Sequence, residues 1–475
     1  MQTSPIKVEE QISLTSLGIP SDVYKQSNLS LESDRFVTIK EAPQGDKIFF
    51  NIVDITKGYK PQRKELKADS ILMHPSRPII SMRTGGDQPS NGIQIVDLNK
   101  REVLREVSIP EQIQFWTWVN ETTLGLVCTR GIYHIDIAAK SYDAGVTALF
   151  RKSEDIERVS AQILKYAVDS SGKWCVLFGI YSDSQTKTLH GMVQLYSIEQ
   201  KASQNLEGFV PHFADVALVD ANYKNTVLAF VGKKPSETFW NFLILEVGKP
   251  IDAGRKVKKK QTFQMAPDVS ATDIPILSYV SEKYALTFII AHSGYLYVHE
   301  MFTGFMIYRG RISTDMIIAC CKHTASDGML CVNKKGVVLL SKIDEGTIVN
   351  YIQTRCSHIP DAGGIAFKIA QAGSLPGAEQ LLISLFNKYF SEQDYTNAAK
   401  TAAQAPNGIL RTAEIINKFK NAPKVPGSRT QPLLQYFSYF LESNVKLNAT
   451  ETMELVRPIL AQGKKRLGGN LGEGK

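Results

Sequence analysis

The apolar residues of this chain change their spacing near residue 350. Before that point most apolar runs are short and alternate with polar residues, which is typical of half-buried strands. After it the spacing becomes helical, and the clearest stripe is Leu381, Leu382, Leu385, Phe386, Tyr389 and Phe390. Positions i, i+1, i+4, i+5, i+8 and i+9 share one face of a helix. The sequence therefore predicts an all-β unit followed by an all-α unit.

Residues 1–345 repeat one pattern seven times. An apolar–polar–apolar step closes a strand-like run, and a turn-prone or charged stretch follows. The seven steps are residues 53–55, 96–98, 135–137, 196–198, 245–247, 299–301 and 341–343. Their intervals of about 39 to about 61 residues match the size of a four-stranded blade. We predict a seven-bladed β-propeller over residues 1–345, with a pair of β-sandwiches as the alternative fold.

A propeller must also close its ring, because no blade can bury both of its faces alone. Residues 6–9 alternate between apolar and polar side chains, and we expect them to supply the missing strand of the last blade. The insertions at residues 85–92 and 182–188 are rich in turn-forming or polar residues. We expect both insertions to form loops.

Residues 346–475 carry helical stripes separated by helix-breaking residues. The expected helices are residues 381–390, 397–403, a segment that begins at Thr412, 433–441, and 451–462, which contains Pro458. Paired alanines in the second of these would let a neighbouring helix approach closely. Helix pairs of this length stack in series, so we predict the start of an α-solenoid.

The composition is that of a soluble globular protein, with 43% hydrophobic and 21% charged residues among 475. Glu9 and Glu10 stand where a signal peptide would need its apolar core. No run approaches the roughly 20 apolar residues of a membrane span. We therefore expect a cytoplasmic protein whose six cysteines are reduced.

The net charge of +8 favours acidic partners. The densest basic run covers residues 255–260, and we expect it to be a solvated loop. Aromatic residues are not interleaved with the basic ones, as a platform for stacking bases would require. Nucleic acid is therefore not an expected partner.

Patterns that would carry catalysis or metal binding are missing from the sequence. The eight histidines are scattered without zinc-ligand spacing, and no G-x-S-x-G motif is present. We predict no enzymatic activity, no metal and no cofactor. Propellers can instead bind extended peptides in grooves between blades, and a basic propeller suits short acidic and hydrophobic motifs.

Several strings extend this interpretation to a family. They are LESDRF at 31–36, VNKKG at 332–336, AAKTAAQAPNGILRT at 398–412, QPLLQYFSYFLE at 431–442 and VRPIL at 456–460. In this order they resemble the clathrin heavy chain family. That family has a seven-bladed terminal propeller followed by an α-solenoid leg, which implies residues 346–475 are the linker and the start of the leg. The family's distal leg and trimerisation region have no counterpart in this sequence.

The resemblance implies a vesicle-coat scaffold on the cytoplasmic face of coated pits and coated vesicles. Its propeller would capture short motifs of adaptor and accessory proteins, and it would meet membranes only through those adaptors. Association with other heavy chains and with light chains would belong to a full-length form only. The alternatives are another propeller–solenoid protein, coatomer-like or a regulatory hub, and a propeller enzyme with polar groups converging on the central channel.

The resemblance also implies a groove between the first two blades that takes an L-Φ-x-Φ-[DE] peptide. The matching positions are Lys64, Leu66, Ile80, Gln94, Val96 and Arg101. Val96 stands where the family commonly has an aromatic residue, and Val103 stands where a second lysine is expected. Gln62 replaces an apolar residue, and the insertion at 85–92 enters the same hairpin. These changes predict weaker binding or an altered motif, with Arg105 as a candidate replacement for the missing charge.

Two further family sites match less completely. Gln162, Leu164 and Ile180 correspond to a top-surface site for a tryptophan-containing motif, although Gln26 replaces its expected aromatic residue. The second set corresponds to a groove between the fourth and fifth blades, in which Gln200 replaces an arginine. Its matching residues are Trp174, Leu195 and Gln204. Leu164, Trp174 and Leu195 have a purely structural alternative as blade core.

Overall fold

The computed structural model describes residues 4–457 apart from 46, 85–90, 140–144, 184–187, 219–222, 234–236, 249–257, 271–272, 376, 406–407, 426–429 and 444. The chain divides into two compact units, Met1–Tyr351 and Ile352–Lys475. The division falls within helix α2 (Ile348–Arg355), a few residues beyond the boundary after residue 345 that the change of spacing predicted.

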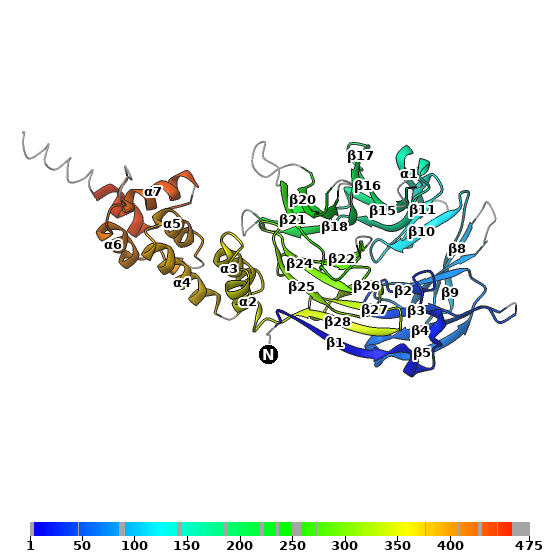
Figure 1. Cartoon of the computed structure of the whole chain (residues 1–475). Helices are drawn as coiled ribbons and strands as arrows, with labels where there is room; N and C mark the ends of the chain where they lie inside the picture. The colour runs from blue at the N-terminus through cyan, green and yellow to red at the C-terminus, as the bar shows by residue number, and fades with distance from the viewer. Residues whose placement is uncertain are drawn as a thin grey trace, which may run out of the picture. The chain divides into compact units, whose positions relative to one another are not determined.

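The first unit consists of seven four-stranded antiparallel sheets, which confirms the predicted seven-bladed propeller (Figure 1). Blades 1 and 2 contain β2 (Leu29–Ser30), β3 (Phe36–Lys40), β4 (Phe49–Asp54), β5 (Lys60–Glu65), β6 (Ser70–Met73), β7 (Ile79–Thr84), β8 (Asn91–Asp97) and β9 (Glu102–Ile109). Blades 3 and 4 contain β10 (Ile113–Trp118), β11 (Thr123–Cys128), β12 (Gly131–Asp136), β13 (Val146–Arg151), β14 (Gln162–Val168), β15 (Trp174–Ser182), β16 (Leu189–Ser197) and β17 (Ala202–Glu207). Blades 5 and 6 contain β18 (Phe209–Val216), β19 (Asn225–Gly232), β20 (Trp240–Glu246), β21 (Lys258–Phe263), β22 (Pro275–Ser281), β23 (Leu286–Ala291), β24 (Tyr295–Glu300) and β25 (Met306–Arg311).

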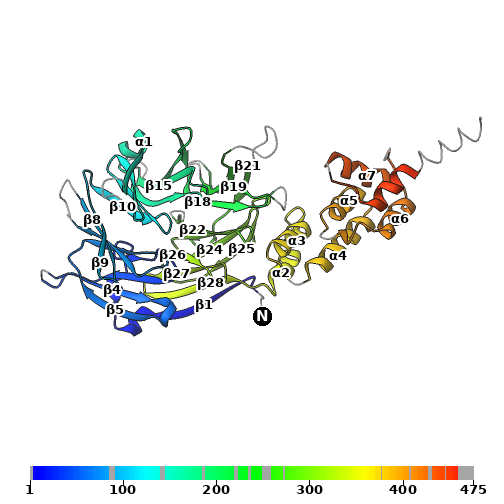
Figure 2. The ribbon, with the colours of Figure 1, turned by 180° about the vertical axis from the view of Figure 1, so that it is seen from behind.

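Blade 7 joins the first strand of the chain to the last strands of the propeller (Figure 2). Its strands are β26 (Ile317–His323), β27 (Gly328–Asn333), β28 (Val337–Ile343) and β1 (Ile6–Ser13). β1 runs antiparallel to β28, with Ile6 opposite Ile343 and Glu9 opposite Leu340. The expected ring closure by residues 6–9 is therefore confirmed. The seven repeated steps all fall at the end of the third strand of a blade.

The first strands of the blades line the centre of the ring. β10, β14, β18, β22 and β26 contact one another in that order, and β26 also contacts β2. Each of these five strands shifts register near its start, for example between Ile163 and Lys165 in β14 and between Phe209 and His212 in β18. A bulge re-aims the side chains that follow it. The channel-lining residues are therefore not those that simple alternation assigns.

Alternation along the other strands sends the two faces of a blade into different cores. In β8, Ile93 and Ile95 belong to a buried cluster shared with blade 3. Val96, on the opposite face, packs in a cluster shared with blade 1. The interface of blades 1 and 2 and that of blades 2 and 3 thus have separate apolar cores.

The second unit is helical, which confirms the predicted change of architecture. Besides α2, it contains α3 (Ala362–Ala372), α4 (Ala378–Ser391), α5 (Tyr395–Ala403), α6 (Ala413–Asn421) and α7 (Pro432–Glu442). In α4 the predicted stripe packs inward, with Leu382 and Phe386 completely buried. Ala398, Ala399 and Ala402 of α5 are also completely buried, and α5 contacts both α4 and α7. The small alanine side chains permit this close approach.

The basic run was expected to be a loop, but its residues Lys258, Lys259 and Lys260 begin β21, the outermost strand of blade 5. An outermost strand faces solvent and needs no alternation of apolar and polar residues, so its sequence resembles that of a loop. Residues 255–257, most of the insertions at 85–92 and 182–188, and Pro458 lie outside the described residues.

Candidate functional site

The apolar residues predicted for the blade 1–2 groove gather in one cluster. Ile80 of β7 lies directly opposite Val96 of β8, so both side chains point from the same face of blade 2. Leu66 follows β5 of blade 1, and its N–H donates to the carbonyl of Ile48 at 3.1 Å. All three belong to the cluster between the blades: Ile80 is buried, whereas Leu66 and Val96 are half-buried. Leu66 and Val96 are therefore the accessible apolar members of this cluster, and Ile80 belongs to its buried core.

The polar residues predicted for this groove lie around that cluster. Gln94 is opposite Met82, on the same face of β8 as Val96, and is half-exposed. Lys64 is a half-buried residue of β5, and Arg101 is exposed in the β8–β9 turn. None of these three side chains forms a hydrogen bond or ion pair with another residue in the described part of the chain. An amide and two cations are thus available to a ligand.

A local turn holds Arg101 in place. The carboxylate of Asp97 accepts hydrogen bonds from the backbone N–H groups of Asn99 and Lys100 at 2.9 and 3.1 Å. Arg101 then takes a left-handed conformation, with φ of 56°. Lys201 takes the same conformation, with φ of 51°, in the corresponding turn of blade 4. The two positions are matched in backbone and charge but belong to different blades.

The departures from the family pattern have clear positions. Val103 lies opposite Val96 with 49% of its surface exposed, on the same face of blade 2 as the apolar cluster. Arg105 does not replace the lysine expected at position 103. It lies opposite Ile95, on the face of blade 2 that packs toward blade 3, and it is 7% exposed.

The residues predicted for a top-surface site are also neighbours. Gln162 of β14 lies directly opposite Ile180 of β15, and Leu164 occupies the bulge of β14. Gln162 is exposed, and both Leu164 and Ile180 are half-buried, so all three are accessible. Gln26 is exposed in the segment before β2.

The third predicted set lies on the face of blade 4 that meets blade 5. Leu195 and Gln204 are directly opposite each other on β16 and β17. The indole Nε1 of Trp174 lies 3.8 Å from the place that a Cβ of Gly248 would occupy in blade 5. Leu195 is only 7% exposed, whereas Trp174 is half-buried and Gln204 is exposed. Leu195 is thus mainly core, and Trp174 and Gln204 are the accessible members.

Sequence reasoning missed one polar pair next to the top-surface site. Lys165 of β14 hydrogen-bonds Nδ1 of His212 on β18, with Nζ 2.9 Å away. Lys165 lies opposite Phe178, two residues from Ile180 along β15, so it shares the face that carries Gln162. The register shift after Ile163 produces this placement, and no pattern in the sequence marks it.

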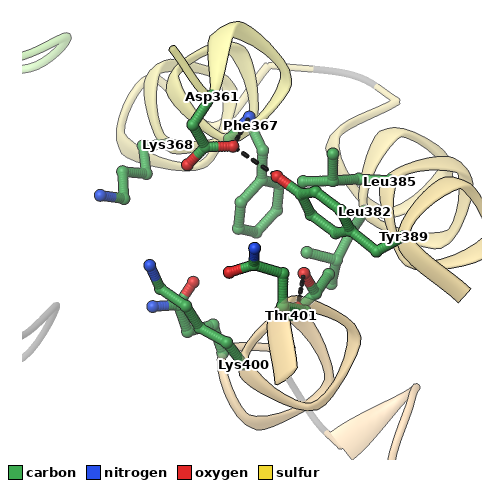
Figure 3. Close-up of a pocket in the computed structure, with 11 residues that line it drawn as sticks. Asp361, Phe367, Lys368, Leu382, Leu385, Tyr389, Lys400 and Thr401 are labelled. Atoms are coloured by element: carbon green, nitrogen blue, oxygen red, sulfur yellow. Dashed lines mark hydrogen bonds between the residues drawn. The ribbon is translucent and has the colours of Figure 1, made fainter. Parts of the chain in front are cut away.

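The helical unit contains a hollow of a different kind (Figure 3). Residues of α3, α4 and α5 line it, and the Tyr389 hydroxyl donates to the Asp361 carboxylate at 2.5 Å across one side. Its volume is about 20 Å³. That is room for about one water molecule, so the hollow is a packing gap rather than a ligand site.

A buried ion pair ties the last helices of this unit together. Arg411 binds both carboxylate oxygens of Glu451, at 2.9 and 2.5 Å, and Glu451 is 0% exposed. The Tyr436 hydroxyl donates to the same carboxylate at 2.7 Å. The backbone N–H of Asn448 donates to Glu451 while the side chain of Asn448 accepts from the Glu451 N–H, which is a reciprocal capping box. The N-x-x-E spacing of residues 448–451 is the sequence pattern that could have predicted this capping box.

Membrane-spanning helices and metal sites were two further possibilities for the described residues. Within the described residues, no helix is both long and apolar enough to cross a membrane. The same residues contain no group of three or more His, Cys, Asp or Glu side chains arranged to hold a metal ion. The six cysteines are all free thiols; Cys320 and Cys321 are half-buried and the others are buried.

Comparison with known proteins identifies relatives over nearly the whole chain. Residues 374–440 match the family described as Clathrin-H-link. A clathrin heavy chain of Dictyostelium discoideum is 33% identical over 465 residues, and that of Drosophila melanogaster is 34% identical over 466. Clathrin heavy chain 2 of Homo sapiens is 32% identical over 466 residues. Each alignment covers 98% of this chain but only 26–27% of the relative, so the chain spans about a quarter of their length.

Proposed function

The chain is a homologue of the N-terminal region of clathrin heavy chains, and on this premise we propose that it serves a vesicle coat by binding peptides. The propeller takes short acidic and hydrophobic motifs of adaptor and accessory proteins, and the helical unit begins the leg of the coat lattice. The protein contacts the membrane only through those adaptors, which bind the cytoplasmic face of the membrane. Association with other heavy chains and with light chains belongs to the longer form that the relatives have.

One observation carries this proposal: the accessible surface between blades 1 and 2 combines apolar and cationic groups. Leu66 and Val96 offer apolar contact above the buried Ile80. Lys64 and Arg101 are cations with no partner among the described residues. A peptide of the L-Φ-x-Φ-[DE] type presents the complementary groups, because its apolar side chains alternate and its end is acidic.

The binding chemistry follows from these groups. Apolar side chains of the peptide displace water from Leu66 and Val96, and the amide of Gln94 can hydrogen-bond the extended peptide backbone. The acidic residue pairs with Lys64 and Arg101, each pair contributing about 0.2–1 kcal/mol at this exposure. Val96 offers less surface than an aromatic residue, and Val103 offers no charge. Moderate affinity is therefore expected.

The decisive experiment titrates a fluorescent L-Φ-x-Φ-[DE] peptide against the wild-type chain and a Gln94→Ala/Arg101→Glu variant. We expect the variant to bind at least about tenfold more weakly, a loss of about 1.4 kcal/mol. The substitutions lie on an exposed rim, so thermal unfolding should change little.

Lys201→Glu is the matched control, because it makes the same charge change in a turn of the same conformation on blade 4. We expect this variant to bind the peptide as the wild type does. Equal binding by the wild type and the Gln94→Ala/Arg101→Glu variant would contradict the site. An equal loss in the Lys201→Glu variant would show that only net charge matters.

The other two sets of residues are proposed as additional peptide sites of the same propeller. Gln162, Leu164 and Ile180 form an accessible patch beside the central channel. Trp174 and Gln204 offer an indole and an amide near blade 5. An Ile180→Glu variant and a Trp174→Ala variant separate these two sites, since the residues lie toward opposite ends of β15.

A further inference from the structure

We propose that the top-surface site of blade 4 selects peptides with an acidic side chain, and that Lys165 binds this carboxylate at the edge of the central channel. This inference rests on the proposed peptide-binding function of Gln162, Leu164 and Ile180. It adds a specificity that those three uncharged side chains cannot supply themselves.

The first support is position. Gln162 lies opposite Ile180 and Lys165 lies opposite Phe178, two residues further along β15. Residues two apart on a strand point from the same face, so Lys165 adjoins the patch that Gln162 and Ile180 form. This face turns toward blade 5, where the ring of Phe209 lies 6.3 Å from the ring of Phe178. A peptide on the patch would therefore pass within reach of the Lys165 side chain.

The second support is how the ammonium group is held. Lys165 donates a hydrogen bond to Nδ1 of His212 at 2.9 Å. An ammonium group is only a donor, so the imidazole Nδ1 accepts and the proton of the neutral ring lies on Nε2. Burial lowers the pKa of His212 well below its usual range, and the positive charge of Lys165 lowers it further. His212 stays neutral at pH 7 and is a positioning residue that fixes the direction of Lys165.

The third support is that no opposite charge among the described residues acts on the Lys165 ammonium group. Burial lowers the pKa of Lys165 to about 8, and Cys320 is the titratable group in the described structure that opposes this shift. The pKa of the Cys320 thiol is itself raised by burial to about 11, so the thiol is neutral at pH 7. Tyr279, whose ring lies 6.4 Å from that of His212, has a pKa raised by burial and is neutral too. None of these groups compensates the ammonium charge.

Lys152 is a buried lysine whose positive charge is compensated by nearby carboxylates. Burial also lowers the pKa of this lysine, but the carboxylates of Glu157 and Glu111 oppose the shift. Its ammonium group bonds the side-chain oxygen of Gln114 at 2.6 Å. Among the described residues, no carboxylate acts on Lys165 in this way. A ligand carboxylate would supply the missing charge, and a charge-assisted bond in this partly buried place is stronger than one at the surface.

The test uses peptides that contain one tryptophan and an aspartate placed one to four residues away, each paired with a peptide in which asparagine replaces the aspartate. Binding is measured by fluorescence anisotropy at pH 6.5 and at pH 9.5. In the wild type we expect at least one aspartate peptide to bind about tenfold more tightly than its asparagine partner at pH 6.5. That preference should fall to about twofold or less at pH 9.5, where Lys165 is mostly deprotonated.

Three variants complete the test. Lys165→Gln should bind both peptides of the pair equally and as tightly as the wild type binds the asparagine peptide, whereas Lys165→Arg should keep the preference. Lys173→Gln is the matched control: this exposed lysine of blade 4 pairs with Glu199 at 2.7 Å, and its loss should leave the preference unchanged. Circular dichroism and thermal unfolding verify that each variant is folded.

The outcomes separate this inference from the function on which it rests. If the wild type binds both peptides of every pair equally, the carboxylate site is refuted while the top-surface site stands. A preference that survives in Lys165→Gln refutes the role of Lys165. If no peptide binds the wild type, or if Ile180→Glu leaves peptide binding unchanged, the top-surface site itself is refuted, and the carboxylate site with it.

Discussion

Arg411 in the helical unit and Arg101 in the propeller show two uses of the same side chain. Arg411 grips a fully buried carboxylate with two hydrogen bonds and also bonds the carbonyl of Lys446 at 2.7 Å. Arg101 is exposed in a turn and has no partner among the described residues. A cation whose hydrogen bonds are satisfied within the fold stabilises it, whereas one that lacks partners can serve a ligand. We therefore expect Arg411 to contribute to stability and Arg101 to contribute to ligand binding.

The largest expected effect breaks the buried ion pair. Arg411→Met leaves the carboxylate of Glu451 buried without its cation, and losing one partner of a buried pair costs about 3–5 kcal/mol. We expect the free energy of unfolding of the helical unit to fall by about that amount, measured by urea denaturation followed with helical circular dichroism. Lys420→Met is the control, because Lys420 pairs with Glu454 while 46% exposed. A control loss as large as that of Arg411→Met would contradict the distinction.

A smaller effect of the same ion pair should follow pH. Burial works to raise the pKa of Glu451, but hydrogen bonds from Arg411, Asn448 and Tyr436 outweigh it and hold the pKa below its usual range. A carboxylate with a lowered folded-state pKa stabilises the fold fully above its unfolded pKa of about 4.3. That contribution is lost as the pH falls through the lower folded value. Urea denaturation at a series of pH values should show this loss of unfolding free energy in the wild type and a smaller loss in Glu451→Gln. The same pH dependence in both proteins would contradict the prediction.

For the propeller cations Lys64 and Arg101 we expect peptide binding to change and stability to stay nearly the same. Lys64→Met and Arg101→Met should each weaken binding of an L-Φ-x-Φ-[DE] peptide about threefold to fivefold, since each removes one partly exposed ion pair. The free energy of unfolding should stay within about 0.5 kcal/mol of the wild type. Calorimetric titration and urea denaturation of the same samples measure both quantities. A stability loss above about 2 kcal/mol would place these cations with Arg411.

The smallest effect should be a gain. Val96→Tyr would place an aromatic side chain in the cluster between blades 1 and 2, where the valine is half-buried. We expect peptide affinity to rise about twofold to threefold, because more apolar area is covered on binding. Val103→Lys, at the exposed position opposite Val96, should add a similar gain through charge. If neither substitution changes the affinity, the peptide does not contact this part of blade 2.

Much of the fold could be predicted because its signals are local. The apolar–polar–apolar steps mark the ends of third strands, where a buried alternating strand meets a tight turn such as the one that Asp97 caps. The Leu382 and Phe386 stripe marks α4 for the same reason. The outermost strands could not be predicted from alternation. β5, β17 and β21 are mostly exposed, so their residues do not alternate between apolar and polar. Lys258–Lys260 was misassigned to a loop on this account.

The candidate sites were only partly predictable, because they depend on register. Ile80, Val96 and Leu66 could be assigned from the family resemblance, and the structure places them in one cluster. That Arg105 faces blade 3 depends on its pairing with Ile95, which sequence spacing does not reveal. The Lys165–His212 pair depends on bulges in two strands of different blades. Such long-range coincidences have no local signature.

The pairing of β1 with β28 also sets the order of events while the chain is being made. Ribosomes add roughly 5–20 residues per second, so β1 waits on the order of 20–70 seconds before β28 has been synthesised. During that interval residues 6–13 have no partner strand, and backbone groups left unpaired can pair with other chains. The charged side chains Lys7, Glu9 and Glu10 of this segment oppose such pairing. A nascent chain interrupted before Ile343 cannot complete blade 7, which makes this unit sensitive to any stall late in its synthesis.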